Sequence, residues 1–280
     1  MRWSNGMLGG MAQELRTVGD HLREWRQRRR MSQLDFACEA DISTRHLSFL
    51  ETGRAQPSRD MLLHLAERLD VPLRERNVLL VAAGYAPIFR ERALDDPALS
   101  AARDAIDQVL SGHEPFPALS VDRYWNLIAA NRAVAPLLTG AAPALLQPPV
   151  NVLRLALHPE GLAPRTVNLT EWRTHLLARL RRQVELSAEP RLVELLRELE
   201  AYPAPRRNGA PAREAEPATA VAVPFRLRVG ERVLSFFSTV TMFGTPLDIT
   251  LSELAIEAFF PADAETAAAL RGGIAGVLAG

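Results

Sequence analysis

The chain has 280 residues, of which 48% are hydrophobic, and its 33 basic residues balance 33 acidic ones. This length allows one or two domains with packed cores, and the zero net charge argues against a nonspecific nucleic-acid coat protein. Cys38 is the only cysteine, which excludes disulfides within the chain and cysteine-rich zinc sites. Because no apolar run could span a bilayer and no apolar signal core is present, we expect a cytoplasmic protein.

The charges are unevenly distributed along the chain. Residues 21–59 contain eight arginines and five acids, a local excess of three positive charges, so the rest of the chain carries three net negative charges. A basic module on a mildly acidic body is typical of a DNA-binding protein with a separate sensing domain.

The first predicted helix follows residues 1–17, which have no strong period and are interpreted as a flexible tail. Val18, Leu22 and Trp25 recur at helical spacing, and the helix ends in the arginine run 28–30. Three arginines at a helix C-terminus either complement the helix dipole or contact DNA phosphates. The sequence leaves both interpretations open.

The next stretch predicts two short helices that meet at a tight turn. Ser32 caps the first helix and forms a capping-box pair with Asp35. The helix ends at Asp41, one of the few side chains that tolerate a positive φ. Ser43 caps the second helix, and Gly53 stands where a terminating glycine is expected.

The second of these helices has the character of a recognition helix. On a helical wheel Leu47 and Leu50 face the supporting helix, whereas Arg45, Ser48 and Phe49 point away. A short polar outward face with one arginine is typical of a helix that meets base edges. The alternative is an ordinary helical hairpin whose outer face is only solvated.

Two more helices complete the N-terminal region. Leu62, Leu65 and Leu69 form a fourth amphipathic stripe, and Pro72 opens a fifth helix that Gly84 closes. We therefore predict an all-α five-helix domain over residues 18–84. Residues 85–97 are expected to link it to a second domain, residues 98–280.

The second domain mixes helices and strands. The order of elements predicts an α+β fold with an antiparallel sheet and helices packed on one face. The expected strands are 118–121 and 125–129, which form a hairpin, followed by 221–229, 231–243 and 247–260. The expected helices are 99–110, 131–138, 150–157, 170–187, 190–201 and 263–278. Residues 203–219 are predicted to be a mobile loop, and Gly230 and residues 244–246 to be turns.

Two motif sets resemble known families. The helix-turn-helix family of phage-repressor type, also called XRE or Cro/C1-type, is resembled by residues 43–59, Ser-Thr-Arg-His-Leu-Ser-Phe-Leu-Glu-Thr-Gly-Arg-Ala-Gln-Pro-Ser-Arg. At the position of Asp41 the family often has a glycine. In the second half, residues 122–126, 157–159, 243–246 and 259–263 resemble the MmyB-like ligand-binding domain of bacterial regulators. The resemblance implies a phage-repressor-like DNA-binding domain, a PAS-like C-terminal domain and a small apolar ligand.

The predicted DNA contacts divide into base and phosphate contacts. Arg45 can bind guanine O6 and N7, and Phe49 either contacts a thymine methyl group or packs against a neighbouring element. Ser43, Arg54 and Arg59 are better placed for phosphates, and the resemblance implies that Gln33 binds a phosphate and braces a recognition side chain. The full predicted set is Gln33, Ser43, Thr44, Arg45, His46, Ser48, Phe49, Arg54 and Arg59.

The predicted ligand site combines apolar strand residues with an arginine that could pair with a ligand carboxylate. The candidates are Arg123, Trp125, Leu127, Arg154, Phe236, Phe237, Met242 and Phe243. The alternative is that the inward-facing residues fill a core, and that the domain serves dimerisation or protein interaction without a ligand.

No catalytic or metal-binding constellation is apparent. His113, His158 and His175 are far apart, and the chain has no paired metal-ligand motif, nucleophile elbow or phosphate-cradling loop. We therefore expect no enzyme, no cofactor and no membrane partner. The prediction is a transcription regulator that binds double-stranded operator DNA as a homodimer and senses a small apolar ligand such as a fatty acid.

Overall fold

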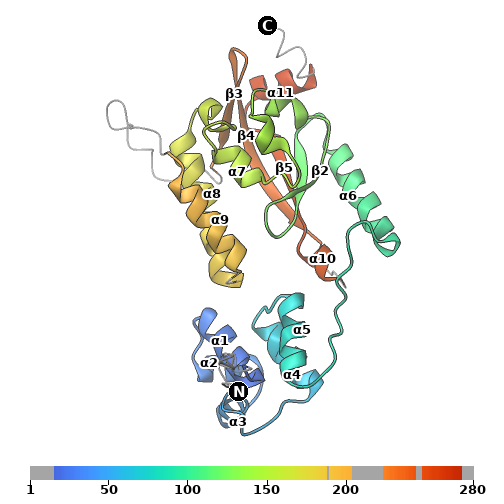
Figure 1. Ribbon diagram of the computed structural model, residues 1–280, viewed down its shortest axis with the longest axis vertical. Coiled ribbons are helices and arrows are strands. Elements are labelled where there is room, and N and C mark those ends of the chain that lie inside the picture. The colour runs from blue at the N-terminus through green and yellow to red at the C-terminus, as the bar shows by residue number, and fades with distance from the viewer. Residues whose placement is uncertain (1–15, 188, 204–222, 244–247, 273–280) are drawn as a thin grey trace, which may run out of the picture. The chain divides into compact units, whose positions relative to one another are not determined.

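The computed structural model describes residues 16–187, 189–203, 223–243 and 248–272. The chain forms two compact units, residues 1–90 and residues 91–280 (Figure 1). Each unit has its own buried hydrophobic clusters.

The first unit contains the five predicted helices. They are α1 (Val18–Arg28), α2 (Gln33–Glu39), α3 (Thr44–Glu51), α4 (Arg59–Arg68) and α5 (Leu73–Ala82). Each of the first four begins after a hydroxyl side chain that accepts a backbone N–H three residues on: Thr17, Ser32, Ser43 and Ser58. Such caps satisfy N–H groups that a helix start would otherwise leave unpaired.

The turn between α2 and α3 confirms the predicted helix-turn-helix. Asp41 has a φ of 52°, so aspartate adopts the left-handed conformation that glycine often supplies in this family. Gly53, with a φ of 71°, ends α3 as predicted.

The core of the first unit holds α3 tightly. Phe36, Leu47 and Leu50 are fully buried, and Ala37 is buried where α2 meets α3. Gly19 lets α1 approach the same helix closely, because a Cβ at this position would lie 2.5 Å from the carbonyl oxygen of Leu50. Close packing on two sides leaves only the outward face of α3 for a partner.

The second unit is built on a five-stranded antiparallel sheet with the order β2-β1-β5-β4-β3, which confirms the predicted α+β class. Its strands are β1 (Ala118–Val121), β2 (Leu127–Ala130), β3 (Phe225–Val229), β4 (Arg232–Met242) and β5 (Ala255–Pro261). Hairpin β1–β2 is paired as expected, and the last three strands complete the sheet.

Helices cover both faces of this sheet, so the prediction that they pack on one face only was wrong. Leu119 and Phe236 face α7 (Val152–Leu157), α8 (Leu169–Ser187) and α9 (Pro190–Ala201). Ala118 and Ile256 face the opposite side, where they pack against α6 (Ser100–Gly112). Figure 1 shows α6 on the other side of the sheet from α8 and α9, which lie side by side. The pleat explains the division, since successive strand residues point to opposite faces.

Short elements complete the unit. They are the 3₁₀ helices η1 (Pro97–Leu99), η2 (Ala135–Leu138), η3 (Pro143–Leu146) and η4 (Ala163–Arg165), and the helices α10 (Ile249–Ser252) and α11 (Ala264–Arg271). Thr266 of α11 accepts the backbone N–H of Ser235 through its hydroxyl oxygen, which ties this helix to β4.

Two predictions in the first hairpin were wrong. Trp125 belongs to the turn, not to the second strand: its φ is 67° and its N–H donates to the carbonyl of Asp122. Asn131 does not cap a helix that runs to residue 138. Its buried amide donates to the carbonyls of Leu110 and Phe116, and its Oδ1 accepts the N–H of Ala118. These contacts join distant segments, and no local pattern signals them.

The strand predicted to start at residue 247 also begins later. Asp248 instead caps α10, where its carboxylate accepts the N–H of Thr250, and Arg92 pairs with the same carboxylate at 3.0 Å. Strand β5 starts only at Ala255. Most of the predicted loop 203–219, the turn 244–246, the N-terminal segment 1–15 and the end of the last helix lie outside the described residues.

Candidate nucleic-acid interface and ligand cavity

Helix α3 presents the face predicted to meet DNA. Ser43 fixes its start, because the hydroxyl oxygen accepts the backbone N–H of His46 at 3.1 Å. Arg45 is exposed one residue into the helix and has no ion pair among the described residues. The remaining members of this face are partly exposed: Thr44, His46, Ser48 and Phe49.

Phe49 lies between two arginines. The guanidinium carbon of Arg45 is 5.4 Å from the centroid of the Phe49 ring, and that of Arg54 is 6.0 Å away. A cation–π contact at an exposed site is worth about 0.5–1 kcal/mol, enough to favour one range of arginine conformations over the others. The geometry therefore adds a third role to the two that the sequence left open for Phe49, that of ordering Arg45 and Arg54.

Of the residues predicted to contact phosphates, Ser43 precedes α3, Arg54 follows it, and Arg59 begins α4. Arg54 and Arg59 are exposed. The Nε of Arg59 is 3.6 Å from an oxygen of the exposed Asp60, a surface pair too weak to hold the arginine in place. Both guanidinium groups can therefore reach an external anion.

The arginine run after α1 serves the fold instead. Arg29 donates to the carbonyl oxygens of Leu69 and Asp70 at 2.7 and 2.8 Å, and Arg28 pairs with Glu24 at 2.6 Å. The contacts of Arg29 brace the end of α1 against the end of α4, the Arg28–Glu24 pair lies within α1, and Arg30 is the exposed member of the run.

A buried ionic cluster supports α3 from behind, and sequence reasoning missed its centre, Glu51. The two carboxylate oxygens of Glu51 accept hydrogen bonds from Arg26 at 2.6 and 2.9 Å, and one of them also accepts the amide of Gln33 at 2.8 Å. The side chain of Glu51 is fully buried, and that of Arg26 is 10% exposed. The cluster thus joins α1, α2 and α3.

The electrostatics of this cluster are favourable. Burial raises the pKa of Glu51, but hydrogen bonds from Arg26 and Gln33 and the nearby positive charges outweigh it, so the pKa is lowered. The sequence contained a signal for this residue, because Glu51 follows Leu47 by four positions and thus interrupts an otherwise apolar stripe. Gln33 donates to the buried Glu51 of α3, and the two roles that the resemblance implied for it, bracing a recognition side chain and contacting a phosphate, stay predictions.

The second unit contains a cavity of about 90 Å³ on the sheet face that α7 and α8 cover. Most small-molecule pockets enclose roughly 300–1,000 Å³, so in this form the cavity suits a thin chain, and a bulkier group would have to displace side chains. Its wall is almost wholly apolar and includes Leu119, Leu127, Leu137, Leu153, Leu155, Ala156, Leu176, Phe225, Phe236 and Phe259.

Glu257 is the charged residue in this wall. It lies on the central strand β5, is 5% exposed, and pairs with Arg179 of α8 at 3.0 Å. The guanidinium of Arg179 also lies 4.4 Å from the ring centroid of Trp125. The pair neutralises a carboxylate that would otherwise be costly in an apolar surrounding.

Trp172 is a second residue of the wall with a polar side-chain atom. It is 4% exposed, and its Nε1–H has no hydrogen-bond partner among the described residues. Its ring is stacked between Phe225 at 4.9 Å and His175 at 5.4 Å. Buried indole N–H groups usually find an acceptor, so an unpaired one beside a cavity is a position where a ligand acceptor would be stabilised.

Arg165 lies close to the same cavity and was also missed. Its Nη2 donates to the carbonyl of Leu137, whose side chain lines the cavity, and no acidic side chain pairs with it among the described residues. Burial lowers the pKa of Arg165. A half-buried arginine without a carboxylate partner is a favourable site for an external anion.

The predicted apolar ligand residues separate into two groups. Leu127 and Phe236 line the cavity. Trp125 lies outside its wall and donates its indole N–H to Gln183 at 2.7 Å. Phe237 and Met242 are 37% and 62% exposed, and Phe243 packs with the cluster around α6.

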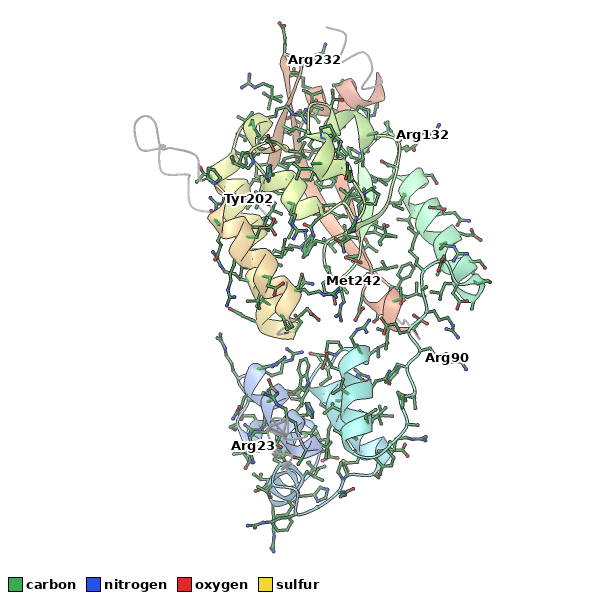
Figure 2. The ribbon with its side chains drawn as sticks, in the orientation of Figure 1. Arg23, Arg90, Arg132, Tyr202, Arg232 and Met242 are labelled. Atoms are coloured by element: carbon green, nitrogen blue, oxygen red, sulfur yellow. The ribbon has the colours of Figure 1, made fainter. Side chains whose placement is uncertain are left out.

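The two predicted arginines are already paired. Arg123 binds Glu189 at 2.6 Å and Glu253 at 3.1 Å. Arg154 binds Glu198 through two nitrogens, which holds the pKa of that carboxyl below its usual range, and Tyr202 donates its hydroxyl to the same group. Figure 2 labels Tyr202. A ligand carboxylate would have to compete with these acids.

Across the residues that the structure describes, no cluster of three or more His, Cys, Asp or Glu side chains is arranged to hold a metal ion. Within the same ranges, none of the helices combines the length and apolar character needed to cross a bilayer.

Comparison with known protein families covers both regions. The family model described as MmyB-like transcription regulator ligand binding domain matches residues 102–272, a range that includes the whole cavity. The family model described as Helix-turn-helix matches residues 22–76, which include α2 and α3. No curated protein matches the chain.

Proposed function

The chain belongs to the family of MmyB-like transcription regulator ligand-binding domains and carries an XRE-type helix-turn-helix, and from this premise we propose that an apolar ligand in its cavity controls operator binding. It is a DNA-binding transcription regulator with a ligand-binding domain. These families are regulator families, not enzyme families. The proposal concerns the ligand, the residues and the coupling between the two activities.

For DNA, the proposal assigns base recognition to Arg45. An exposed guanidinium at the N-terminal end of α3, ordered over Phe49, suits bidentate binding to guanine in the major groove. Ser43, Arg54 and Arg59 would bind phosphates and fix the register, and the remaining predicted contacts flank Arg45 on the same helix.

The protein is proposed to bind DNA as a homodimer. One recognition helix contacts too few base pairs for useful specificity, so regulators of this kind read two half-sites about one helical turn apart. A ligand that prefers one arrangement of the dimer would then change the affinity for DNA.

For the ligand, we propose a thin apolar molecule with a hydrogen-bond acceptor at one end, such as a straight-chain carboxylic acid. The observation that carries this proposal is the Nε1–H of Trp172, a residue of the cavity wall, which has no hydrogen-bond partner among the described residues, whereas Glu257 in the same wall is already paired with Arg179. Arg165 supplies a positive charge that no acidic side chain of the described residues neutralises. A carboxylate there would gain a charge-assisted hydrogen bond, worth about 1.5–3 kcal/mol.

The test is calorimetric titration of the full chain with straight-chain carboxylic acids of increasing length and with the alcohols of equal length. We expect one chain length to bind best, and the acid to bind more tightly than its alcohol. Trp172→Phe should weaken both ligands, because it removes the N–H and keeps only a smaller aromatic ring. Arg165→Gln should remove the preference for the acid, because it removes the charge.

A matched pair of variants separates filling of the cavity from a general effect of added bulk. Ala156→Phe places a ring in the cavity wall and should abolish binding, whereas Ala178→Phe adds the same ring at an exposed position of α8 and should not. If the ligand binds Ala156→Phe as tightly as the parent chain, the cavity is not the ligand site.

The small volume of the cavity favours a second candidate function. A core with only about 90 Å³ of free space could serve dimerisation or protein interaction without a ligand. This alternative predicts that no acid or alcohol of the series binds and that Ala156→Phe stabilises the second unit.

A further inference from the structure

The cavity wall holds two buried polar side chains of opposite hydrogen-bonding character. Trp172 of α8 is 4% exposed, and Glu257 of β5 is 5% exposed. The indole N–H of a tryptophan can only donate a hydrogen bond, whereas an ionised carboxylate can only accept one. A ligand that bonds both residues therefore needs two different polar groups of its own.

Glu257 keeps an unused acceptor although it is paired with Arg179. The Nη1 of Arg179 donates to Oε1 of Glu257 at 3.0 Å, and within the described residues Oε2 accepts no hydrogen bond. Glu257 lies opposite Leu119 in the sheet, and both residues line the cavity. A carboxylate has about four lone-pair sites, so the donor from Arg179 leaves room for a second donor from a ligand.

Two aromatic rings separate Trp172 from Glu257. The ring of Trp172 stacks on that of Phe225 at 4.9 Å, and the ring of Phe225 lies 6.2 Å from that of Phe259. Phe259 and Glu257 are two residues apart on β5, so their side chains point to the same face of the sheet. All four residues line the cavity. Its wall thus runs from a donor, over apolar rings, to an acceptor.

Helix α8 gives the spacing of the two polar groups. Trp172 and Arg179, which binds Glu257, are seven residues apart on this helix. With a rise of about 1.5 Å per residue, they lie about 10 Å apart along the helix axis. One small polar group cannot reach both ends, but the two ends of an extended chain can.

We propose that the ligand is a straight-chain carboxylic acid with a hydroxyl group far along its chain. The inference rests on the proposed function and names the class of its ligand more closely. The acid end accepts the N–H of Trp172, the methylene groups cover Phe225 and Phe259, and the hydroxyl group donates to Oε2 of Glu257.

Charge determines which ligand group lies beside Glu257. A ligand carboxylate there would be repelled by the carboxylate of Glu257, and a ligand ammonium group would be repelled by Arg179. A hydroxyl group carries no charge and can donate to Oε2, so it suits this end. Glu257 is the one acid among the described residues of the wall, so the acid end of the ligand lies away from it.

The experiment is calorimetric titration of the full chain with decanoic acid, 2-hydroxydecanoic acid and 10-hydroxydecanoic acid, which have equal length. An extended chain of this length spans roughly the separation that α8 gives, so only 10-hydroxydecanoic acid places its hydroxyl group beside Glu257. We expect it to bind at least about tenfold more tightly than decanoic acid, because it gains a hydrogen bond to a buried carboxylate. The 2-hydroxy acid should bind no more tightly than decanoic acid, because its hydroxyl group is buried without an acceptor.

A double variant tests the role of Glu257. Glu257→Leu with Arg179→Leu removes the acceptor and leaves no buried charge without its partner. We expect 10-hydroxydecanoic acid to lose its advantage over decanoic acid on this variant. Glu198→Gln is the matched control, because Glu198 also pairs with an arginine, Arg154, but is not a residue of the cavity wall. The control should keep the advantage. If the double variant does not fold, the three acids still test the inference on the parent chain.

The outcomes separate the inference from the proposed function. If decanoic acid and 10-hydroxydecanoic acid bind equally well, the hydroxyl group is not recognised and the inference is wrong, while the proposed function stands. If none of the three acids binds, the inference is also wrong, and the proposed function fails with it only if every other straight-chain acid fails to bind. An advantage that persists in the double variant would overturn the role of Glu257.

Discussion

The interiors of the two units differ in how completely side chains fill them. The first is filled: Phe36, Leu47 and Leu50 are fully buried, and the buried carboxylate of Glu51 has a donor on each oxygen. The second leaves a cavity among mostly apolar side chains and an indole N–H, that of Trp172, for which the described residues provide no acceptor. A filled interior can only present its binding groups on the outside, whereas a hollow one can enclose a ligand.

The difference suggests how the work is divided between them. A recognition helix must be held rigidly, because a displaced guanidinium loses bidentate contact with its base. A sensor must instead gain stability when its cavity is occupied, and cavities cost stability when they are empty.

The largest effect is expected at the centre of the filled unit. Glu51→Ala leaves the buried Arg26 without its partner and should lower the free energy of unfolding of the first unit by about 3–5 kcal/mol. Glu24→Ala also removes a carboxylate paired with an arginine, but at the surface, and should cost no more than about 1 kcal/mol. Urea unfolding with hydrogen exchange of α1–α3 measures both; equal losses would contradict the supporting role of the cluster.

A smaller effect is expected on the outer face of α3. Arg45→Ala should lower binding to a selected operator by about 1–3 kcal/mol and leave binding to unrelated DNA much less affected. Arg59→Ala should instead weaken binding to all sequences and reduce the salt slope by about one unit. Fluorescence anisotropy at several salt concentrations separates the two. If both variants lose affinity equally for all DNA, Arg45 is not a base contact.

The smallest expected effect is on the pH dependence of stability, which should differ between the two units. Burial lowers the pKa of His175, which stacks on Trp172, and Arg179 acts in the same direction. The folded state thus favours the neutral ring, so its contribution to stability is complete above the unfolded pKa of 6.5 and is lost as pH falls below it. In the first unit, the lowered pKa of Glu51 makes its contribution disappear only below about 4.5.

We therefore expect acidification from pH 6.5 to about 5 to lower the urea midpoint of the second unit in the parent more than in a His175→Gln variant. Over the same range, the difference in the urea midpoint of the first unit between the parent and a Glu51→Gln variant should stay constant. A constant difference between the parent and His175→Gln over this range would contradict the assignment.

The sequence predicts the first unit well because its signals are local. Hydroxyl caps, the aspartate at the turn and Gly53 each act within a few residues, and all three have the predicted conformation. What the pattern missed, the cluster around Glu51, depends on side chains 18 and 25 residues away in the chain.

In the second unit, contacts between residues far apart in the sequence determine more of the local structure than they do in the first unit. The helices α8 and α9 were predictable from their periodicity, but Trp125 and Asn131 adopt conformations set by distant partners. The cavity wall comes from η2, α7, α8 and the strands, so strand patterns alone indicated Leu127 and Phe236 and not Leu153 or Trp172. The PAS-like architecture and the site residues stay predictions.

If occupation of the cavity controls operator binding, as we propose, a DNA titration with and without ligand will show it. An operator selected from random DNA would be titrated with the parent chain and with Ala156→Phe, each with and without the best-binding acid. The account predicts that the acid changes the affinity of the parent by roughly 5–150-fold and that of Ala156→Phe not at all. An acid that binds the parent without changing its affinity for the operator would contradict the account.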